Sequence, residues 1–179
     1  MPRIGYCTYI IQEFPPEVYF ESEENPCIIG KFCSIGSRLK VYCGGNHRID
    51  WVSTYPFEIV VDKKEKIEGH PSSKGGVTIG NDVWIGNDVS IMSGSVIGDG
   101  CCIGAGSVVR GKFAPYTVLI GNPAKHHRNR FSIETARRLQ KLAWWDWDLD
   151  DIRKILPELH SNKVNAFFAK VKEMGKWNE

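Results

Sequence analysis

The feature that most constrains the fold is a six-residue repeat that runs from Ile79 to Ala114. In blocks of six, this stretch is IGNDVW, IGNDVS, IMSGSV, IGDGCC, IGAGSV and VRGKFA. Neither the helical period of 3.6 residues nor the strand period of two keeps its register over so many cycles. A fixed period of six is instead the signature of a parallel β-helix. An aliphatic residue opens every repeat: Ile79, Ile85, Ile91, Ile97, Ile103 and Val109.

Each hexad predicts one short strand and one corner, so that three hexads form a triangular coil of about 18 residues. Coils stack at the usual strand spacing of about 4.8 Å, which places each leading aliphatic side chain on its equivalents above and below. The residue four places later also points inward, near a corner. Gly, Asn and Asp fill most positions between, where they tolerate a positive φ. The second inward set is Val83, Val89, Ser95, Cys101, Ser107 and Phe113.

A shorter run of the same repeat begins at Ile29 and reads IGKFCS, IGSRLK and VYCGGN, which predicts one further coil. Residues 1–26 have no sustained period, and we interpret them as an irregular lead-in, part of which could form a degenerate first coil. Where the next hexad should open, the sequence has His47 in place of an aliphatic residue. No hexad fits from there to Gly76, so we predict an excursion loop over about 47–76.

The predicted loop has two halves of different composition. The first, GGNHRIDWVSTYPF, carries Trp51, Tyr55 and Phe57, and such an aromatic content is not typical of disorder. Long loops in compact domains are usually functional or disordered. The three aromatic side chains suit stacking on the ring of a bound ligand, and equally a small core within the loop. The second half, VDKKEKIEGHPSSKGG, is charged and could be mobile.

Beyond Phe131 the period becomes helical, and Ser132 is placed to cap the first helix. We therefore predict two domains: a β-helix over 1–130 and a helical appendage over 131–179. The apolar face of the appendage is expected to pack on the side of the prism or on a neighbouring subunit.

Composition excludes several classes of function. A net charge of +2 over 179 residues favours neither nucleic acid nor a membrane surface as a partner. The sequence has no 18-residue apolar run and no signal-peptide pattern, so we expect a cytoplasmic protein. Its six cysteines include no C-x-x-C pair, which leaves a disulfide framework or a zinc site unsupported, and we predict no metal.

The hexads, the GGNHRIDWVSTYPF loop, IGNDVWIG, GNPAK and the tail RFS…WWDWD together resemble the hexapeptide-repeat acyltransferases. More narrowly, they resemble the xenobiotic acetyltransferase branch, which includes chloramphenicol and streptogramin O-acetyltransferases. The resemblance covers about residues 28–170. It implies a left-handed β-helix, a homotrimer with active sites between subunits, and transfer of an acetyl group from acetyl-CoA. The acceptor would be a hydroxyl of a sugar or of an antibiotic-like molecule.

The reaction requires a base, because a free alcohol is a poor nucleophile near neutral pH. An imidazole is the natural candidate, and the resemblance assigns this role to His47. The alternative for His47 is an ordinary surface histidine. For the other four histidines, His70, His126, His127 and His160, we expect exposed or partner-contacting positions.

Coenzyme A carries a pyrophosphate and a 3′-phosphate, so its site needs cations and backbone donors. The resemblance places Lys125 and Arg128 at the nucleotide end and Asn87 and Ala105 along the pantetheine groove. Arg110 falls near the matching position of the last coil. The alternatives are a corner residue for Asn87 and a solvated cation for Arg110.

Trp84 is predicted on the outer face of the prism, where we place it at the interface between subunits, with the cleft as the alternative. Two functions from other classes are the alternatives. A metalloenzyme similar to the γ-class carbonic anhydrases needs three converging histidines, and residues 79–114 contain none. A non-catalytic β-helix scaffold would have no need of an ordered loop at His47 or of the pair Lys125 and Arg128.

Overall fold

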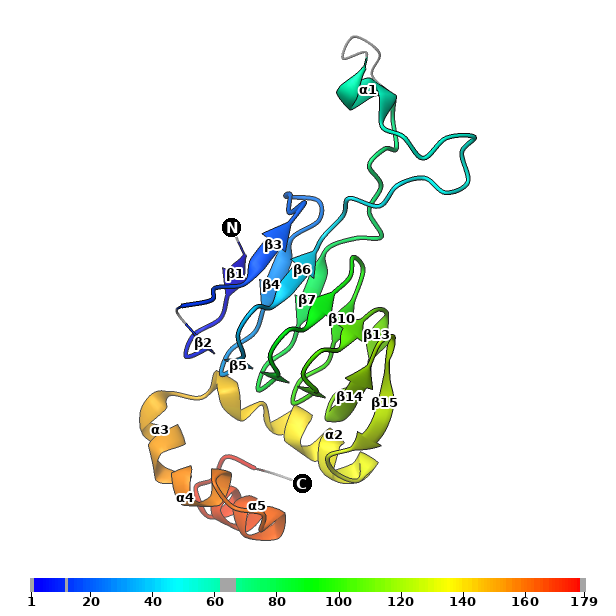
Figure 1. Ribbon diagram of the computed structural model, residues 1–179. Helices are drawn as coiled ribbons and strands as arrows, with labels where there is room; N and C mark the ends of the chain where they lie inside the picture. The colour runs from blue at the N-terminus through cyan, green and yellow to red at the C-terminus, as the bar shows by residue number, and fades with distance from the viewer. Residues whose placement is uncertain (1, 12, 62–66, 178–179) are drawn as a thin grey trace. The chain divides into compact units, whose positions relative to one another are not determined.

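The computed structural model describes residues 2–11, 13–61 and 67–177. The chain forms two compact units, Met1–Arg130 and Phe131–Glu179. All the strands among the described residues belong to the first unit, and the second unit is helical (Figure 1).

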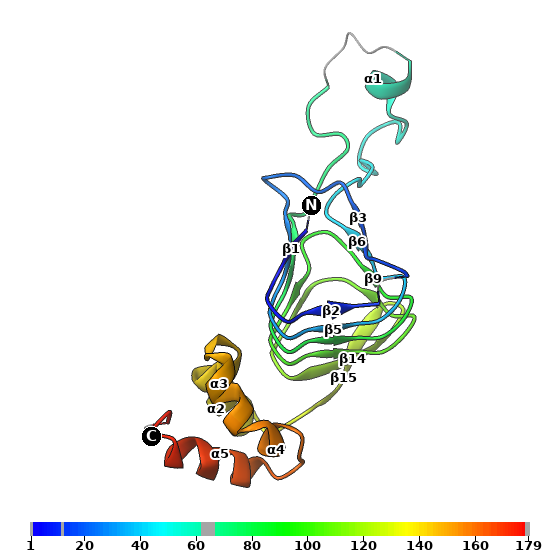
Figure 2. The same cartoon turned by 90° about the vertical axis from the view of Figure 1, so that its left-hand side faces the viewer.

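Successive strands of the first unit enter three different sheets in turn, so that the chain winds in coils. Figure 2 shows these sheets as the three sides of a prism. The first sheet contains β1 (Arg3–Ile4), β4 (Cys27–Ile29), β7 (Val77–Ile79), β10 (Val96–Ile97) and β13 (Lys112–Phe113). The second contains β2 (Tyr9–Ile10), β5 (Ser34–Ile35), β8 (Trp84–Ile85), β11 (Cys102–Ile103), β14 (Thr117–Gly121) and β15 (Ala124–Asn129). The third contains β3 (Glu17–Tyr19), β6 (Lys40–Tyr42), β9 (Ser90–Ile91) and β12 (Val108–Val109).

The predicted inward positions form the core of this prism. Every aliphatic residue that opens a hexad is at most 2% exposed. Ile35, Ile85 and Ile103 pair in register across the second sheet, which stacks identical side chains directly upon one another. The second inward positions are buried as well, and Phe113 packs against the same cluster. The pairs of neighbouring strands named above are parallel, except for β14 with β15, which is antiparallel.

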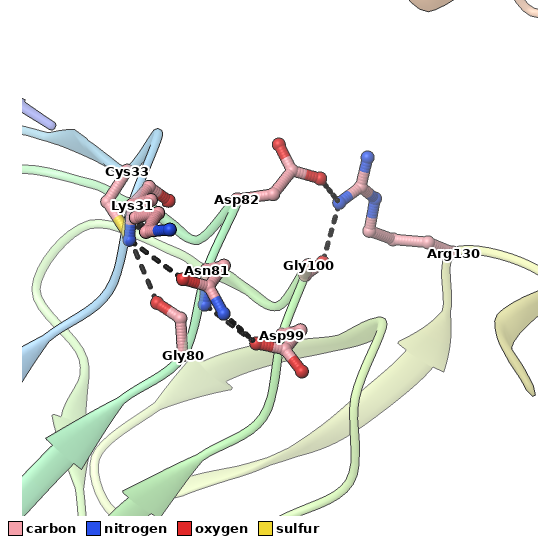
Figure 3. A network of polar contacts seen from close by, with 8 residues as sticks. All are labelled: Lys31, Cys33, Gly80, Asn81, Asp82, Asp99, Gly100 and Arg130. Atoms are coloured by element: carbon pink, nitrogen blue, oxygen red, sulfur yellow. Dashed lines mark hydrogen bonds and ion pairs between the residues drawn. The ribbon is translucent and has the colours of Figure 1, made fainter. Parts of the chain in front are cut away.

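The corners explain why the repeat uses Asn and Asp. The side-chain oxygen of Asn81 accepts a hydrogen bond from the backbone N–H of Lys31 in the coil before, at 2.9 Å. Asp99 does the same for the N–H of Asn81, at 2.8 Å (Figure 3). Asp82 and Asp88 occupy the left-handed region, with φ of 53° and 60°, as the repeat predicts for such residues. The side chains of Asn81 and Asp99 thus each satisfy a backbone N–H of the neighbouring coil.

Residues 1–26 are more regular than an irregular lead-in. They supply β1, β2 and β3, which pair in parallel with β4, β5 and β6. The degenerate first coil, given above as the alternative for part of this segment, is therefore the better description. Tyr6, Tyr9 and Phe20 of this terminal coil are more than half exposed.

The second unit contains α2 (Ile133–Leu142), a 3₁₀ turn (Trp144–Asp146), α3 (Leu149–Lys154), α4 (Leu156–Leu159) and α5 (Val164–Glu173). Ser132 caps α2 as predicted, and its hydroxyl accepts from the Thr135 N–H at 3.1 Å. Phe168 packs against Trp177 and beneath the Arg138 guanidinium, which lies 3.9 Å from the ring centroid. Within the described part of the chain, no helix has the length and apolar character needed to cross a membrane.

Candidate functional site

The excursion loop leaves the prism between the third and first sheets, after β6 and before β7 (Figures 1 and 2). The coils continue across it, because Ile29 pairs directly with Ile79. The segment between β6 and β7 spans residues 43–76, slightly more than predicted, and its described part includes the short helix α1 (Phe57–Val60). The predicted mobility of the charged second half falls partly on residues 62–66, which lie outside the described residues.

The two ends of the loop are joined at a neck formed by Asn46 and Ser72. Their backbones form an antiparallel bridge, with N–H to carbonyl distances of 2.9 and 2.8 Å. The Asn46 side chain also donates to the Ser93 hydroxyl of the prism, at 2.9 Å. This neck ties the loop to the rigid coils, and His47 is the next residue in the chain.

His47 is exposed and held by one strong hydrogen bond. Its Nδ1 lies 2.6 Å from the carbonyl oxygen of Thr54. A carbonyl can only accept, so Nδ1 carries the proton and Nε2 of the neutral ring keeps a free lone pair. Asp50, which is close in sequence, instead pairs with Arg48 through contacts of 2.8 and 2.5 Å. That guanidinium lowers the pKa of the Asp50 carboxyl to about 2.

The side chain of His70 is buried, so the expectation of an exposed side chain is wrong, and contact with a partner stays a prediction. Its side chain is only 2% exposed, and Nδ1 lies 2.9 Å from a carboxylate oxygen of Glu58. The ring meets that of His47 edge-on, with 4.9 Å between centroids and an angle of 85°. Sequence reasoning missed Glu58 and Thr54 as well, since nothing in their spacing links them to His47.

The three aromatic residues predicted to bind the acceptor fall into two groups. Trp51 is half-buried, and its ring centroid lies 5.9 Å from that of His70. The guanidinium carbon of Arg48 lies over the same indole, 5.2 Å from the ring centroid. Trp51 is therefore part of a small core within the loop. Tyr55 and Phe57 pack edge-to-face at 4.9 Å, and both remain about half exposed, which leaves ring surface for a ligand or a partner.

A groove of about 320 Å³ lies at the corner between the second and third sheets, and both Asn87 and Ala105 line it. Trp84, 55% exposed, and Tyr9 form part of its wall, and the position of Trp84 at an interface between subunits stays a prediction. The Asn87 side-chain oxygen accepts from the Ser37 N–H at 2.9 Å, which is the structural role of a corner residue.

The basic residues of the predicted cofactor site lie on two different edges of the prism. Lys125 and Arg128 are exposed on β15, the outermost strand of the second sheet. Arg128 stands opposite Val118, which pairs with Cys102 and through it with Trp84, so Arg128 shares the outward row of the groove wall.

Arg110 and Arg130 differ from that pair. Arg110 follows β12, at the corner between the third and first sheets, and does not line the groove. Arg130 contacts two corners of the prism. It donates to the Gly100 carbonyl at 2.6 Å and pairs with Asp82 at 3.3 Å (Figure 3). Burial raises the pKa of the Asp82 carboxyl, and Arg130 opposes that shift.

Within one chain the predicted residues therefore form two separate surfaces. His47, its loop and Arg110 belong to the corner between the third and first sheets. Asn87 and Ala105 belong to the corner between the second and third sheets. Among residues 2–11, 13–61 and 67–177, no three His, Cys, Asp or Glu side chains converge in a way that could hold a metal ion.

Comparison with known proteins places the chain among acetyltransferases. Residues 76–111 match the family described as bacterial transferase hexapeptide (six repeats). A probable macrolide acetyltransferase of Lysinibacillus sphaericus is 46% identical, over 76% of this chain and 78% of that protein. A chloramphenicol acetyltransferase of Escherichia coli is 41% identical, over 79% of this chain and 69% of that protein.

A similar solved structure is a hexapeptide-repeat containing acetyltransferase of Vibrio cholerae, with a TM-score of 0.51 and 25% identity. The match covers 73% of this chain and 63% of that one. The shared part agrees with the coiled arrangement of three parallel sheets described above.

Proposed function

The chain belongs to the hexapeptide-repeat acyltransferases, in the xenobiotic acetyltransferase branch, and from that premise we propose that it moves the acetyl group of acetyl-CoA to a hydroxyl of a small molecule. It is an acyltransferase, as its relatives are. The acceptor class, a sugar or an antibiotic-like compound, rests on the exposed aromatic pair Tyr55 and Phe57 and on the names of those relatives. The left-handed winding of the coils is part of the same proposal.

His47 is the proposed general base, and the observation that carries this role is its bond to Thr54. Because Nδ1 donates to that carbonyl, Nε2 is free to take the proton of the acceptor hydroxyl. The hydroxyl oxygen then attacks the thioester carbonyl carbon and forms a tetrahedral intermediate. When this intermediate collapses, the C–S bond breaks and the proton passes from the imidazolium to the departing thiolate, which releases coenzyme A and the acetyl ester.

Acetyl-CoA is proposed to lie along the second sheet. Its pantetheine arm fits the groove lined by Asn87 and Ala105, where a corner without a large side chain leaves room. Its phosphates would meet Lys125 and Arg128, which are exposed on β15 in the same sheet. Arg110 would contact a cofactor bound in a neighbouring subunit, because it lies on the other edge.

The proposed active unit is a homotrimer with its sites between subunits. The position of His47 supports sites between subunits, because His47 lies on a different corner from the groove of its own chain, and the resemblance supplies the number of three subunits. In addition, Ile49 and Val52 of the loop are 88% and 110% exposed, and apolar side chains so exposed suit contact with a second copy. A monomeric mass in sedimentation experiments would contradict this arrangement.

A thiol-release assay tests the function directly. The full chain is incubated with acetyl-CoA and, one at a time, chloramphenicol, streptogramin A, and a panel of sugars and nucleotide sugars. We expect coenzyme A release that depends on one class of hydroxyl acceptor, with a mass increase of one acetyl group on that acceptor. Release that never depends on an acceptor, or acetyl groups found on amines alone, would contradict an O-acetyltransferase.

A further inference from the structure

Two buried side chains in the excursion loop, Glu58 and His70, have no part in the reaction step described above. Glu58 lies in the first turn of α1, and His70 comes from the half of the loop that returns to the prism. Their side chains are 10% and 2% exposed, and they join through the 2.9 Å contact between Nδ1 and the carboxylate. Burying a carboxylate is unfavourable unless it is hydrogen-bonded, and an apolar pair would fill a loop core more simply.

The carboxylate of Glu58 determines which nitrogen of the His70 ring carries the shared hydrogen. Because a carboxylate only accepts, the hydrogen that joins the two side chains is on Nδ1 of His70. The other ring nitrogen, Nε2, is buried and has no hydrogen-bond partner among the residues that the structure describes. Buried polar atoms of this kind are few in native proteins, and each calls for an explanation. The nearest aromatic neighbours of the ring are His47 on one side and Trp51 on another.

The contact with His47 restricts the orientation of that imidazole. The two rings meet at 85°, with 4.9 Å between centroids, so the edge of one abuts the face of the other. A half-turn of the His47 ring about its Cβ–Cγ bond would put Cδ2 in the place of Nδ1 and would break the bond to Thr54. Both histidines are also fixed at the neck, because His47 follows Asn46 and His70 lies two residues before Ser72.

We propose that Glu58 and His70 are positioning residues, which hold the His47 imidazole so that its proton-free Nε2 faces the acceptor. This inference rests on the proposed role of His47 as the base. Neither side chain touches the substrate; Glu58 orients His70, and His70 orients His47. Misplacing a reacting group by about 1 Å can lower a rate by about 10²-fold, so a contact of this kind is large enough to matter.

Two substitutions separate positioning from packing. In His70→Asn, the amide places an N–H near the position of Nδ1, so Glu58 keeps its partner while the ring against His47 is lost. In Glu58→Gln, the hydrogen bond from His70 remains but the charge is removed. We expect His70→Asn to lower kcat by about 10- to 100-fold and Glu58→Gln by a smaller factor, with the KM for acetyl-CoA within about twofold. His160→Asn, at an exposed position in the second unit, is the matched control and should match the wild type.

The decisive measurement repeats His70→Asn in a His47→Ala background. If His70 acts only through His47, the second substitution lowers the residual rate by less than about twofold. A full further loss in that background, or a fall in Tm that tracks the fall in kcat, would assign His70 to folding alone and overturn the inference. Should His70→Asn fail to fold, Glu58→Gln in both backgrounds decides by the same criterion.

The two proposals fail in different ways. Wild-type kcat in His70→Asn together with an inactive His47→Ala contradicts only the positioning role. An active His47→Ala contradicts the base, and the positioning role with it.

Discussion

The prism and the excursion loop are stabilised in opposite ways. In the prism, one type of contact recurs in every coil, such as the row of Ile35, Ile85 and Ile103 across the second sheet. Among the loop residues that the structure describes, no contact recurs. It depends on single polar pairs, among them Asn46 with Ser72 and His70 with Glu58.

The difference shows where chemistry can be placed in a repeating fold. A repeat fills each position with the same kind of side chain, and here those side chains are aliphatic and buried. A histidine with one free ring nitrogen needs a unique set of neighbours, which only an interruption of the repeat supplies. Substitutions in the two regions should therefore change different quantities, stability in the prism and turnover in the loop.

The largest expected effect on stability is in the middle of the prism. Ile91→Ala removes a fully buried side chain between Val41 and Val109 of the third sheet, away from the groove, and such truncations lower the free energy of unfolding by about 2–5 kcal/mol. Urea denaturation measures this loss, and kcat per folded molecule should stay within about twofold. A loss of less than about 1 kcal/mol in the free energy of unfolding, or a folded but inactive protein, would contradict the claim that the prism sets stability and the loop sets turnover.

A smaller effect, mainly on turnover, is expected at the neck. Asn46→Ala removes the side-chain bonds to Ser93 and to the Ser72 carbonyl, while the backbone bridge can remain. We expect kcat to fall by about tenfold, with about 1–2 kcal/mol lost from the free energy of unfolding. Asn25→Ala, at a half-buried turn position before β4, is the control and should keep the turnover of the wild type. Unchanged turnover in Asn46→Ala would mean that the neck does not position His47.

The next prediction compares two arginines that are close in sequence. Arg128→Ala should raise the KM for acetyl-CoA by about three- to tenfold without changing Tm, because this side chain is exposed on β15. Arg130→Ala should instead lower Tm and leave that KM unchanged, because its partners are Asp82 and Gly100. Steady-state kinetics and thermal melts of both variants test the pair. The reverse result would place the nucleotide site at Arg130 and not at Arg128.

The smallest effect is expected for the ion pair between Arg38 and Asp88 on the outer face of the corner. Both side chains are about half exposed, so Arg38→Ala should shift Tm by less than about 2 °C. Arg38 lowers the pKa of the Asp88 carboxyl, so its contribution is present above the usual pKa of Asp and is lost as pH falls through the lowered value. Thermal melts at neutral and acidic pH measure it, and a large shift at neutral pH would show that corners are stabilised by charge.

Most of the prism could be predicted from the sequence because its physics is periodic. The position of each aliphatic residue that opens a hexad predicts that its side chain is buried, and the structure confirms this for all of them. The first coil was harder, because residues 1–26 lack the period although β1–β3 still pair with the coil below. Pairing needs only backbone groups and a partner strand.

The sequence predicts where in the chain the candidate site lies, but not the contacts among its side chains. His47 was found because it stands where an aliphatic residue should be. Thr54, Glu58 and His70 were not, because their contacts depend on how an aperiodic loop folds back at the neck. The groove residues Asn87 and Ala105 were placed together by the repeat, which fixes their spacing.

The central claim is that turnover depends on the residue at which the repeat is interrupted. It is tested most directly by kcat of His47→Ala, measured with acetyl-CoA and the acceptor identified in the thiol-release assay, alongside the Tm of both proteins. The account predicts a fall of about 10²- to 10⁴-fold with an unchanged Tm, as expected for loss of a general base on an exposed side chain. Turnover within tenfold of the wild type would contradict it.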